Sequence, residues 1–325
     1  MQQQKTQLGK VIAGGLFGVV WGAIALAPSH MTVAHAAEKH TGRLELTSTN
    51  IVERDLTLSE ADQVNPVQKL DFDEYFETDN WLRYKVRLSG VDGYHAALQF
   101  VDREYFDRSD LSGFTIMPQL EYWKQVSDRL RVRVRGDFAH RVRDGDHYFD
   151  RMRGEVRLRY QIAPLSRVFV TGTVSHTDYN ESVLRGFDQM QYRLAAERRW
   201  YAEDHRSYFS IGAFSEWTDA DLARASFTHY GPEARLIKWL DEITRLRVRA
   251  RYRLKKFDDN FSAADPVKRN DRRPSLSLDL RRNLDWGGAL VGGVGWLDNR
   301  SNITIRDADG ITAFAGIEFK HRFNH

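Results

Sequence analysis

The sequence predicts an all-β fold: a transmembrane antiparallel up-and-down β-barrel of fourteen strands, with twelve strands as the alternative. Three observations lead to this prediction. From Trp81 to the C-terminus, apolar residues recur at every second position, which is the period of a strand and not of a helix. Short and long connections alternate between these runs, and the last run closes on an aromatic residue, Phe323.

Composition excludes a bundle of transmembrane helices. The chain has 325 residues, of which 42% are hydrophobic and 29% are charged, and its mean hydropathy is −0.55. A helical bundle needs several apolar runs of about 20 residues, whereas only Val11–Ala27 is long and apolar. The absence of cysteine excludes disulfides, thiolate metal sites and a lipid-modified N-terminal cysteine.

Residues 1–36 are expected to be a secretory signal peptide. Two lysines precede the apolar run Val11–Ala27, Pro28 ends that run, and Ala34 and Ala36 supply the small residues that a signal peptidase reads. A single membrane anchor is the alternative, because 17 apolar residues lie at the lower limit for spanning. The small residues and the lack of a positive flank after the run favour cleavage.

The chain is therefore expected to divide into three segments. They are the signal peptide (1–36), an acidic N-terminal segment with the first strand or a plug or arm (37–80), and the outer-membrane barrel (81–325). Cleavage would leave a mature chain of about 289 residues.

The alternation is clearest in three runs, Leu130–Arg141, Arg151–Ile162 and Arg245–Lys255. In each, arginines occupy one set of alternate positions and apolar residues occupy the other. A helix would scatter these arginines around its surface, whereas a strand separates the two faces.

Thirteen strands follow from the same period, most of them longer than the 5–6 residues usual in soluble sheets. They are 81–89, 94–103, 114–125, 130–141, 152–162, 167–178, 187–199, 207–217, 226–238, 243–255, 272–283, 287–297 and 311–323. Bacterial single-chain barrels have an even number of strands, so another strand is expected before residue 81. The candidates are 42–50, or 70–76 followed by a tight turn over 77–80.

Alternating connection lengths predict short periplasmic turns and longer outer loops. The short connections are Gly90–Gly93, Val126–Arg129, Ala163–Ser166, Trp239–Glu242 and Leu284–Trp286. The long ones are Glu104–Gly113, Val142–Asp150, Thr218–Ala225, Lys256–Asp271 and Asp298–Gly310.

Aromatic residues are expected to collect at both membrane interfaces. Trp200, Tyr201, Trp239 and Trp286 lie at the short turns, and Tyr105, Tyr148, Tyr179 and Trp296 lie near the long loops.

The final strand resembles the C-terminal sorting signal of outer-membrane barrels, with Asn324 and His325 following its aromatic end. Its apolar face comprises Ala315, Ile317, Phe319 and Phe323. This resemblance implies the barrel assembly machinery as a partner.

Two motifs near the C-terminus carry a family resemblance. Arg269–Arg273 opens a strand, and Asn299–Asn302 precedes the final one. They are similar to the closing hairpins of β-barrel porins encoded with exopolysaccharide genes and of surface lipoprotein assembly modifier barrels. The resemblance implies an outer-membrane barrel and an export role, and it carries no site residues.

Arginine dominates the basic residues, with 37 arginines and 11 lysines. Charge on a lipid-facing position costs about 2–4 kcal/mol at the membrane midplane, so the arginine faces are expected to line the barrel interior. The candidate pore-lining, anion-facing residues are Arg131, Arg133, Arg135, Arg153, Arg157, Arg159, Arg245, Arg247, Arg249, Arg251 and Arg253. Because a guanidinium binds carboxylates, phosphates and sulfates bidentately, the predicted function is a porin-like channel for anionic solutes or acidic oligo- or polysaccharide.

Two alternatives remain open. Inner-face carboxylates could pair with these arginines and occlude the lumen, as in an export or assembly barrel without free diffusion. They are Glu121, Asp137, Glu155, Glu197, Glu233, Asp279 and Glu318. The other alternative is an outer-membrane hydrolase with a site at the rim, whose candidate residues are His140, His147, His176 and His229.

No catalytic residue, cofactor or metal site is predicted, and the protein is not expected to be an enzyme. The Asp-rich segments 144–146 and 307–310 could hold Ca²⁺, but such clusters are more often ordinary turns. The expected location is the cell outer membrane. The expected partners are its lipid and lipopolysaccharide, the assembly machinery, and an anionic solute or polysaccharide; nucleic acid is not among them.

Overall fold

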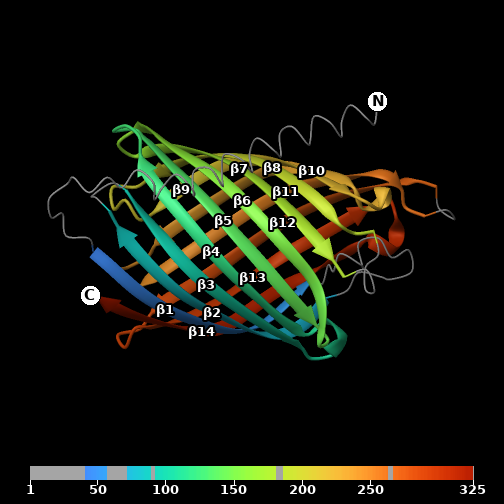
Figure 1. Cartoon of the computed structure of the whole chain (residues 1–325), viewed down its shortest axis with the longest axis horizontal. Coiled ribbons are helices and arrows are strands. Elements are labelled where there is room, and N and C mark those ends of the chain that lie inside the picture. Colours follow the sequence, from blue (N-terminus) through green and yellow to red (C-terminus); the bar gives the residue numbers. More distant parts are fainter. Residues whose placement is uncertain (1–40, 57–71, 89–91, 181–185, 263–265, 325) are drawn as a thin grey trace.

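The protein is a closed barrel of fourteen antiparallel strands, seen in a computed structural model that describes residues 41–56, 72–88, 92–180, 186–262 and 266–324 (Figure 1). Each strand pairs with the next along the chain, and β14 pairs with β1. The predicted fold class and the count of fourteen are thereby confirmed. The expected signal peptide lies outside the described residues.

The strands are 13 to 18 residues long. They are β1 (Thr41–Leu56), β2 (Phe72–Arg87), β3 (Gly93–Tyr105), β4 (Gly113–Gln125), β5 (Leu130–Arg143), β6 (Asp146–Ala163), β7 (Ser166–Tyr179), β8 (Gln189–Tyr201), β9 (Tyr208–Ala220), β10 (Phe227–Trp239), β11 (Thr244–Asn260), β12 (Lys268–Asn283), β13 (Gly288–Ser301) and β14 (Ala308–Asn324). Three short 3-10 helices lie in the longer connections: η1 (Ser109–Leu111), η2 (Ala223–Ala225) and η3 (Thr304–Arg306). Within the described ranges, no helix is long and apolar enough to cross a membrane.

The first strand is the earlier of the two candidates, extended to Leu56. The prediction of a strand at 70–76 with a turn over 77–80 is wrong, because 77–80 lie in the middle of β2. Glu77 and Asp79 face inward, where they accept hydrogen bonds from Arg103 and Gln99 on β3. The outward positions between and after them hold polar residues, which interrupt the apolar alternation without interrupting the strand.

The connection predicted at Val142–Asp150 is also different. β5 and β6 run on to a two-residue turn, Asp144–Gly145, whose φ angles are 51° and 82°. Asp-Gly suits such a turn because both central residues need positive φ. The Asp-rich segment 144–146 therefore forms an ordinary hairpin turn.

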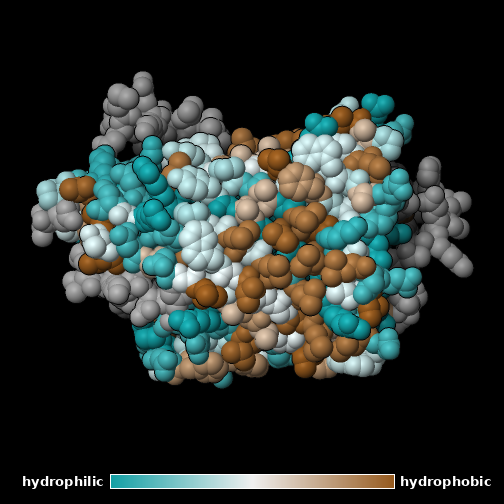
Figure 2. All heavy atoms as spheres, turned by 180° about the vertical axis from the view of Figure 1, so that it is seen from behind, coloured by the Kyte–Doolittle hydropathy of each residue, from teal (hydrophilic) through white to brown (hydrophobic). Residues whose placement is uncertain are grey.

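Apolar side chains cover the outside of the barrel. Leu158, Leu278 and Val294 are 40%, 44% and 57% exposed, respectively, and they alternate with inward-facing polar residues. Figure 2 shows the face behind that of Figure 1, with an apolar area over its middle and right and a hydrophilic end at the left. Such an outer band matches the lipid-facing surface of membrane barrels.

Only some of the aromatic residues expected at interfaces face outward. Trp200, Trp286 and Trp296 do so, at 37%, 60% and 46% exposure. Tyr148 and Tyr179 are instead buried at 3% and contact each other inside the barrel. The position of a residue along its strand indicates how near it lies to the membrane interface. Whether its side chain faces lipid or the lumen depends on which of the two alternating faces of the strand it occupies.

The barrel closes through a register in which Leu44 of β1 lies opposite Phe323 of β14. Just inside this seam, the carboxylate of Glu45 lies 3.0 Å from Lys320 Nζ and 3.3 Å from Arg322 Nε, both on β14. It also lies 3.4 Å from Arg83 Nη1 on β2. One side chain thus joins the first strand to both of its neighbours.

The close packing of β10 against β11 at Gly231 can be tested by substitution. A Cβ added there would lie 1.9 Å from the carbonyl oxygen of Tyr252 on β11. We expect Gly231→Ala to lower the free energy of unfolding in detergent by about 1–3 kcal/mol, because backbone must move. Gly172→Ala is the control, since its Cβ would have no neighbour within 4 Å. Equal stability of the two variants, measured by urea unfolding, would contradict this packing.

The stability of the turn between β8 and β9 should depend on pH in the acid range, because Asp204 holds this turn together. Asp204 accepts hydrogen bonds from the backbone N–H groups of Arg206 and Ser207 and from the Ser207 hydroxyl. These bonds lower the pKa of Asp204 to about 2 from 3.8. Because the folded-state pKa is the lower one, the contribution to stability is present above pH 3.8 and is lost as the pH falls through 2. Carboxyl titration by NMR in detergent should show this midpoint, and a midpoint near 3.8 would contradict it.

Candidate functional site

The candidate site is the barrel lumen, which all eleven predicted arginines face. They lie at alternate positions of β5, β6 and β11, and the apolar residues between them lie on the outside. Met152, Leu158 and Tyr252, for example, are 52%, 40% and 41% exposed on the outer wall. The strands thus place the eleven arginines on the inner face, whereas the role of these arginines in permeation remains a prediction.

The strand register sets many of the lumen arginines directly opposite one another. Six such cross-strand pairs are Arg131 with Arg159, Arg133 with Arg157, Arg167 with Arg199, Arg235 with Arg249, Arg245 with Arg281, and Arg253 with Arg273. Like charges directly opposite on a sheet destabilise it. Each pair therefore requires a counter-charge from a neighbouring strand, from water or from a solute.

Carboxylates supply that counter-charge for six of the eleven predicted arginines. The six are Arg133, Arg135, Arg153, Arg247, Arg249 and Arg251. Glu233 has the largest share, with its carboxylate 2.6 Å from Arg251 Nε and 3.8 Å from Arg249 Nε, and also paired with Arg235. All seven inner-face carboxylates predicted from the sequence form such pairs.

The other five predicted arginines form no ion pair with any carboxylate in the described ranges. Arg131 donates to the Gln125 side chain and Arg157 donates to the Thr171 hydroxyl. No side-chain hydrogen bond or ion pair joins Arg159, Arg245 or Arg253 to another residue of those same ranges, and charged neighbours act on them only at longer range. Among the described residues, the ion pairing of the lumen arginines is therefore incomplete.

Arg253 and Arg273 form a gap in this network. They lie opposite each other on β11 and β12, and neither forms an ion pair with a described carboxylate. Arg273 Nε donates to the Asn299 side chain at 3.0 Å. The Nε of Arg253 is shielded from solvent without a hydrogen-bond partner among described residues. Two guanidiniums in this arrangement form a natural binding point for an oxyanion.

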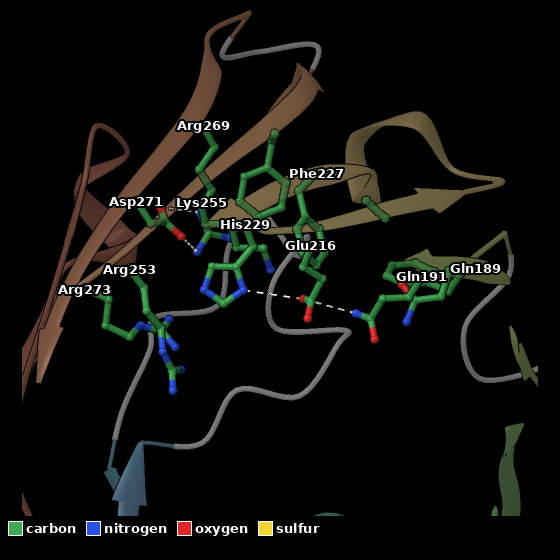
Figure 3. A pocket seen from close by; sticks show the side chains of 13 residues that line it. Gln189, Gln191, Glu216, Phe227, His229, Arg253, Lys255, Arg269, Asp271 and Arg273 are labelled. Carbon is green, nitrogen blue, oxygen red and sulfur yellow. Dashed lines mark hydrogen bonds and ion pairs between the residues drawn. The ribbon is translucent and has the colours of Figure 1, made fainter. Parts of the chain in front are cut away.

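Cavities inside the barrel meet at these residues. One of about 250 Å³ lies toward the loop end and is lined by both Arg253 and Arg273 (Figure 3). A second of about 320 Å³ shares both arginines. A third of about 430 Å³ shares Glu216 with the first and Arg251 with the second. Neighbouring cavities with shared lining residues thus occupy the interior, and charged groups line each of them.

Besides His229, a candidate for the rim hydrolase, the first cavity contains charged groups that were not predicted as site residues (Figure 3). Lys255 Nζ lies 3.5 Å from the centre of the Phe227 ring, and Arg269 is paired with Asp271 at 2.6 Å. His229 and Glu216 approach to 3.4 Å. Arg269 and Asp271 were missed because β12 begins at Lys268, four residues before the predicted start. Continuing the alternation backward from 272 is the signal that could have found them.

The two motifs that carry the family resemblance lie against each other. Asn302 accepts a hydrogen bond from the backbone N–H of Asn270, and Asn299 accepts one from Arg273. Asn299 is 1% exposed and also donates to the carbonyl of Arg306. These motifs therefore join β12, β13 and η3 at the loop end.

The four histidines proposed for a rim hydrolase do not form one group. His229 faces the lumen beside Glu216, whereas His140 and His147 share Asp150 on the outside of the β5–β6 hairpin. His176 is exposed on the outer face of β7. Only His140 and His147 are brought together.

Solved structures of outer-membrane proteins share this fold. One is the in-vitro folded, trimer form of OmpT, an outer membrane protein of Vibrio cholerae, with a TM-score of 0.51 and 7% identity over 87% of this chain and 99% of that one. Another is a loop L8 deletion mutant of OmpT, with a TM-score of 0.50 and 6% identity over 86% and 99%. No family model and no curated protein matches the sequence. At such low identity the likeness shows the outer-membrane barrel fold, without the narrower families suggested by the closing hairpins.

The Glu233 cluster yields a stability test. Glu233→Gln would leave three arginines without their shared carboxylate, so we expect the free energy of unfolding to fall by about 1–3 kcal/mol. The control is Glu74→Gln, because Glu74 and its partner Arg54 are 3.9 Å apart and each 55% exposed. Such an exposed pair contributes about 0–1 kcal/mol. Urea unfolding in detergent compares the two, and a Glu233 variant as stable as the control would contradict the assigned role.

Proposed function

We propose that the protein is an outer-membrane channel whose arginine-rich lumen passes anionic solutes or acidic oligo- or polysaccharide. Three features support the proposal: the fold shared with outer-membrane proteins, the apolar outer band and the inward arginines. The outer membrane is the proposed location, because this surface suits lipid and a closed barrel has no unpaired edge to expose there.

The observation that carries the proposal is the pair Arg253 and Arg273, which lie opposite each other and form no ion pair with a described carboxylate. Guanidiniums facing each other across a strand pair repel, and an anion between them would convert that repulsion into attraction. Two cavities are each lined by both arginines. A row of such points at intervals allows an anion to bind weakly and move on, which is what conduction requires.

The remaining ion pairs have a complementary role in this proposal. Carboxylates such as Glu233 and Asp137 hold arginines against the wall, so these side chains do not collapse across the lumen. Paired arginines thus shape the interior, while Arg159, Arg245 and Arg253 supply the field that acts on a solute.

The direct experiment is conductance of the purified chain in planar lipid bilayers. With a KCl gradient across the bilayer, the reversal potential should take the sign of chloride preference. A cation preference, or the absence of any conductance, would refute an anion channel.

Charge variants should locate the selectivity. Removing one charge beside a water-filled path changes the energy of a passing anion by about 0.5–1 kcal/mol, which is a two- to fivefold change in the anion-to-cation permeability ratio. We expect Arg253→Gln and Arg273→Gln each to lower the anion-to-cation permeability ratio by this factor. The control is the double variant Arg247→Gln with Asp279→Asn, which removes an ion pair without changing net charge and should leave the ratio near that of the unmodified chain. Equal ratios for all three variants would contradict the assignment.

A second candidate is an export or assembly barrel without free diffusion. The ion pairs favour it, because Glu233 alone engages arginines of both β10 and β11 and such networks narrow the interior. It predicts a silent unmodified chain in the same bilayers, and conductance only after Glu233→Gln releases the arginines around it.

A further inference from the structure

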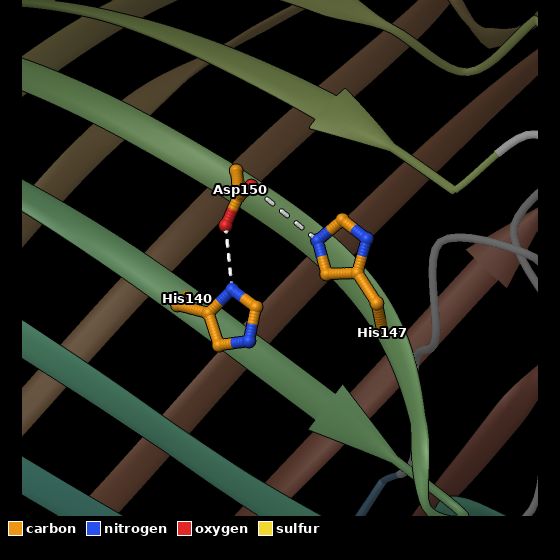
Figure 4. A group of neighbouring side chains, drawn as sticks. All are labelled: His140, His147 and Asp150. Carbon is orange, nitrogen blue, oxygen red and sulfur yellow. Dashed lines mark hydrogen bonds and ion pairs between the residues drawn. The ribbon is translucent and has the colours of Figure 1, made fainter.

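The outside of the β5–β6 hairpin carries two imidazoles and a carboxylate close together (Figure 4). His140 Nδ1 lies 2.8 Å from Asp150 Oδ1, and His147 Nε2 lies 3.5 Å from Asp150 Oδ2. The three potential ligand atoms all lie within 4.8 Å of one another. The imidazole rings are stacked 5.1 Å apart, and each of the three side chains is about 40% exposed.

A β-bulge creates this grouping. Residues three apart on a regular strand point to opposite faces, so His147 should face the lumen if Asp150 faces outward. The register instead jumps from Val142 opposite His147 to Arg141 opposite Phe149, which leaves Tyr148 as an extra residue. A bulge of this kind re-aims side chains, and here it turns His147 to the outside.

The extra residue is held firmly on the other side of the wall. Tyr148 and Phe149 are 3% and 8% exposed and pack with Tyr179 inside the barrel. The aromatic packing fixes the bulge, and the bulge fixes His147 beside Asp150. The group is therefore preorganised by the fold and does not depend on a flexible loop.

A second carboxylate lies beside the first. Asp178 of β7 is the register partner of Asp150, and it is exposed between the buried residues Thr177 and Tyr179. Opposed residues on such a ladder have Cβ atoms about 4.5–5.5 Å apart. Two carboxylates at that separation on one face repel each other, and a cation between them would relieve the repulsion.

His147 also has an unused ligand atom. Its Nε2 is shielded from solvent and forms no hydrogen bond within the described part of the chain. This nitrogen points toward Asp150 Oδ2 at 3.5 Å without forming a hydrogen bond to it (Figure 4), and a shielded ring nitrogen without a hydrogen bond is unfavourable. A metal ion would supply the missing partner.

We propose that His140, His147 and Asp150 bind one divalent transition-metal ion on the outer face of the hairpin, with Asp178 as the fourth ligand. Imidazole and carboxylate together suit Zn²⁺ and its neighbours better than Mg²⁺ or Ca²⁺, which take oxygen ligands. Zinc binds these groups at about 2.0–2.2 Å, so small side-chain rotations that draw the ligand atoms together would complete the site. The spacing of His140, His147 and Asp150 matches no familiar metal motif, because the bulge that aligns them is invisible in sequence.

The ion would fasten the end of the hairpin to β7. It would bridge three neighbouring strands just below the two-residue turn at Asp144–Gly145. The site lies outside the lumen, so this inference is independent of any channel activity.

Zinc binding by the full chain in detergent, stripped with a chelator, tests the proposal. Isothermal titration should show one Zn²⁺ site that His147→Asn and Asp150→Asn each weaken at least about tenfold, since even the outer-shell partners of metal ligands contribute that much. The control is His176→Asn, an exposed histidine on the outer face of β7 with methionines as its register partners, and it should bind like the unmodified chain. Equal Zn²⁺ affinity in the unmodified chain and the His147 variant would overturn the site.

A second measurement uses only the unmodified chain and is unaffected by any folding defect of the variants. Histidine modification by diethyl pyrocarbonate, mapped by mass spectrometry, should be suppressed by Zn²⁺ at His140 and His147 but not at His176. If Zn²⁺ protects none of these residues, or all three equally, the proposed site is wrong.

Discussion

Most of this structure depends on how arginine charge is accommodated inside a closed sheet. Alternation sends every second residue of β5, β6 and β11 into the lumen, and the register sets many of these arginines opposite one another. The carboxylates of Glu121, Asp137, Glu155 and Glu233 hold them apart and against the wall. The arginines without a described carboxylate partner are the ones that we propose act on a solute.

The wall and the lumen are consequences of the same alternation. An apolar outer face satisfies lipid, and a closed ladder satisfies every backbone group within it. Glu45 shows how closely the two requirements are linked, since it faces the lumen while joining β1 to β14 and β2 at the closing seam. The outer face is equally specific at one point, where a bulge turns His147 outward beside His140 and Asp150.

Period-2 patterning was sufficient to predict the fold class, thirteen of the fourteen strands and the facing of the eleven arginines, and the even strand number of bacterial barrels supplied the fourteenth strand. It could not give the partner of each arginine, since register depends on turns and bulges that leave little trace in one sequence. Arg253 and Arg273 meet because of a register between strands whose connecting loop was placed differently from the predicted one. Polar Thr78 and Asn80 interrupt the apolar alternation in the middle of β2, so that part of the strand was not predicted. The extra residue Tyr148 forms the bulge that brings His147 to the outside, and nothing in the alternation indicates it.

We propose that lumen arginines without a carboxylate partner, and not the paired ones, present positive charge to a solute. Anomalous scattering from crystals of the full chain soaked in bromide would test this most directly. We expect bromide peaks beside Arg253 and Arg273 and beside Arg159, with none beside the cluster around Glu233. Peaks confined to the carboxylate-paired arginines, or a lumen without bromide, would contradict it.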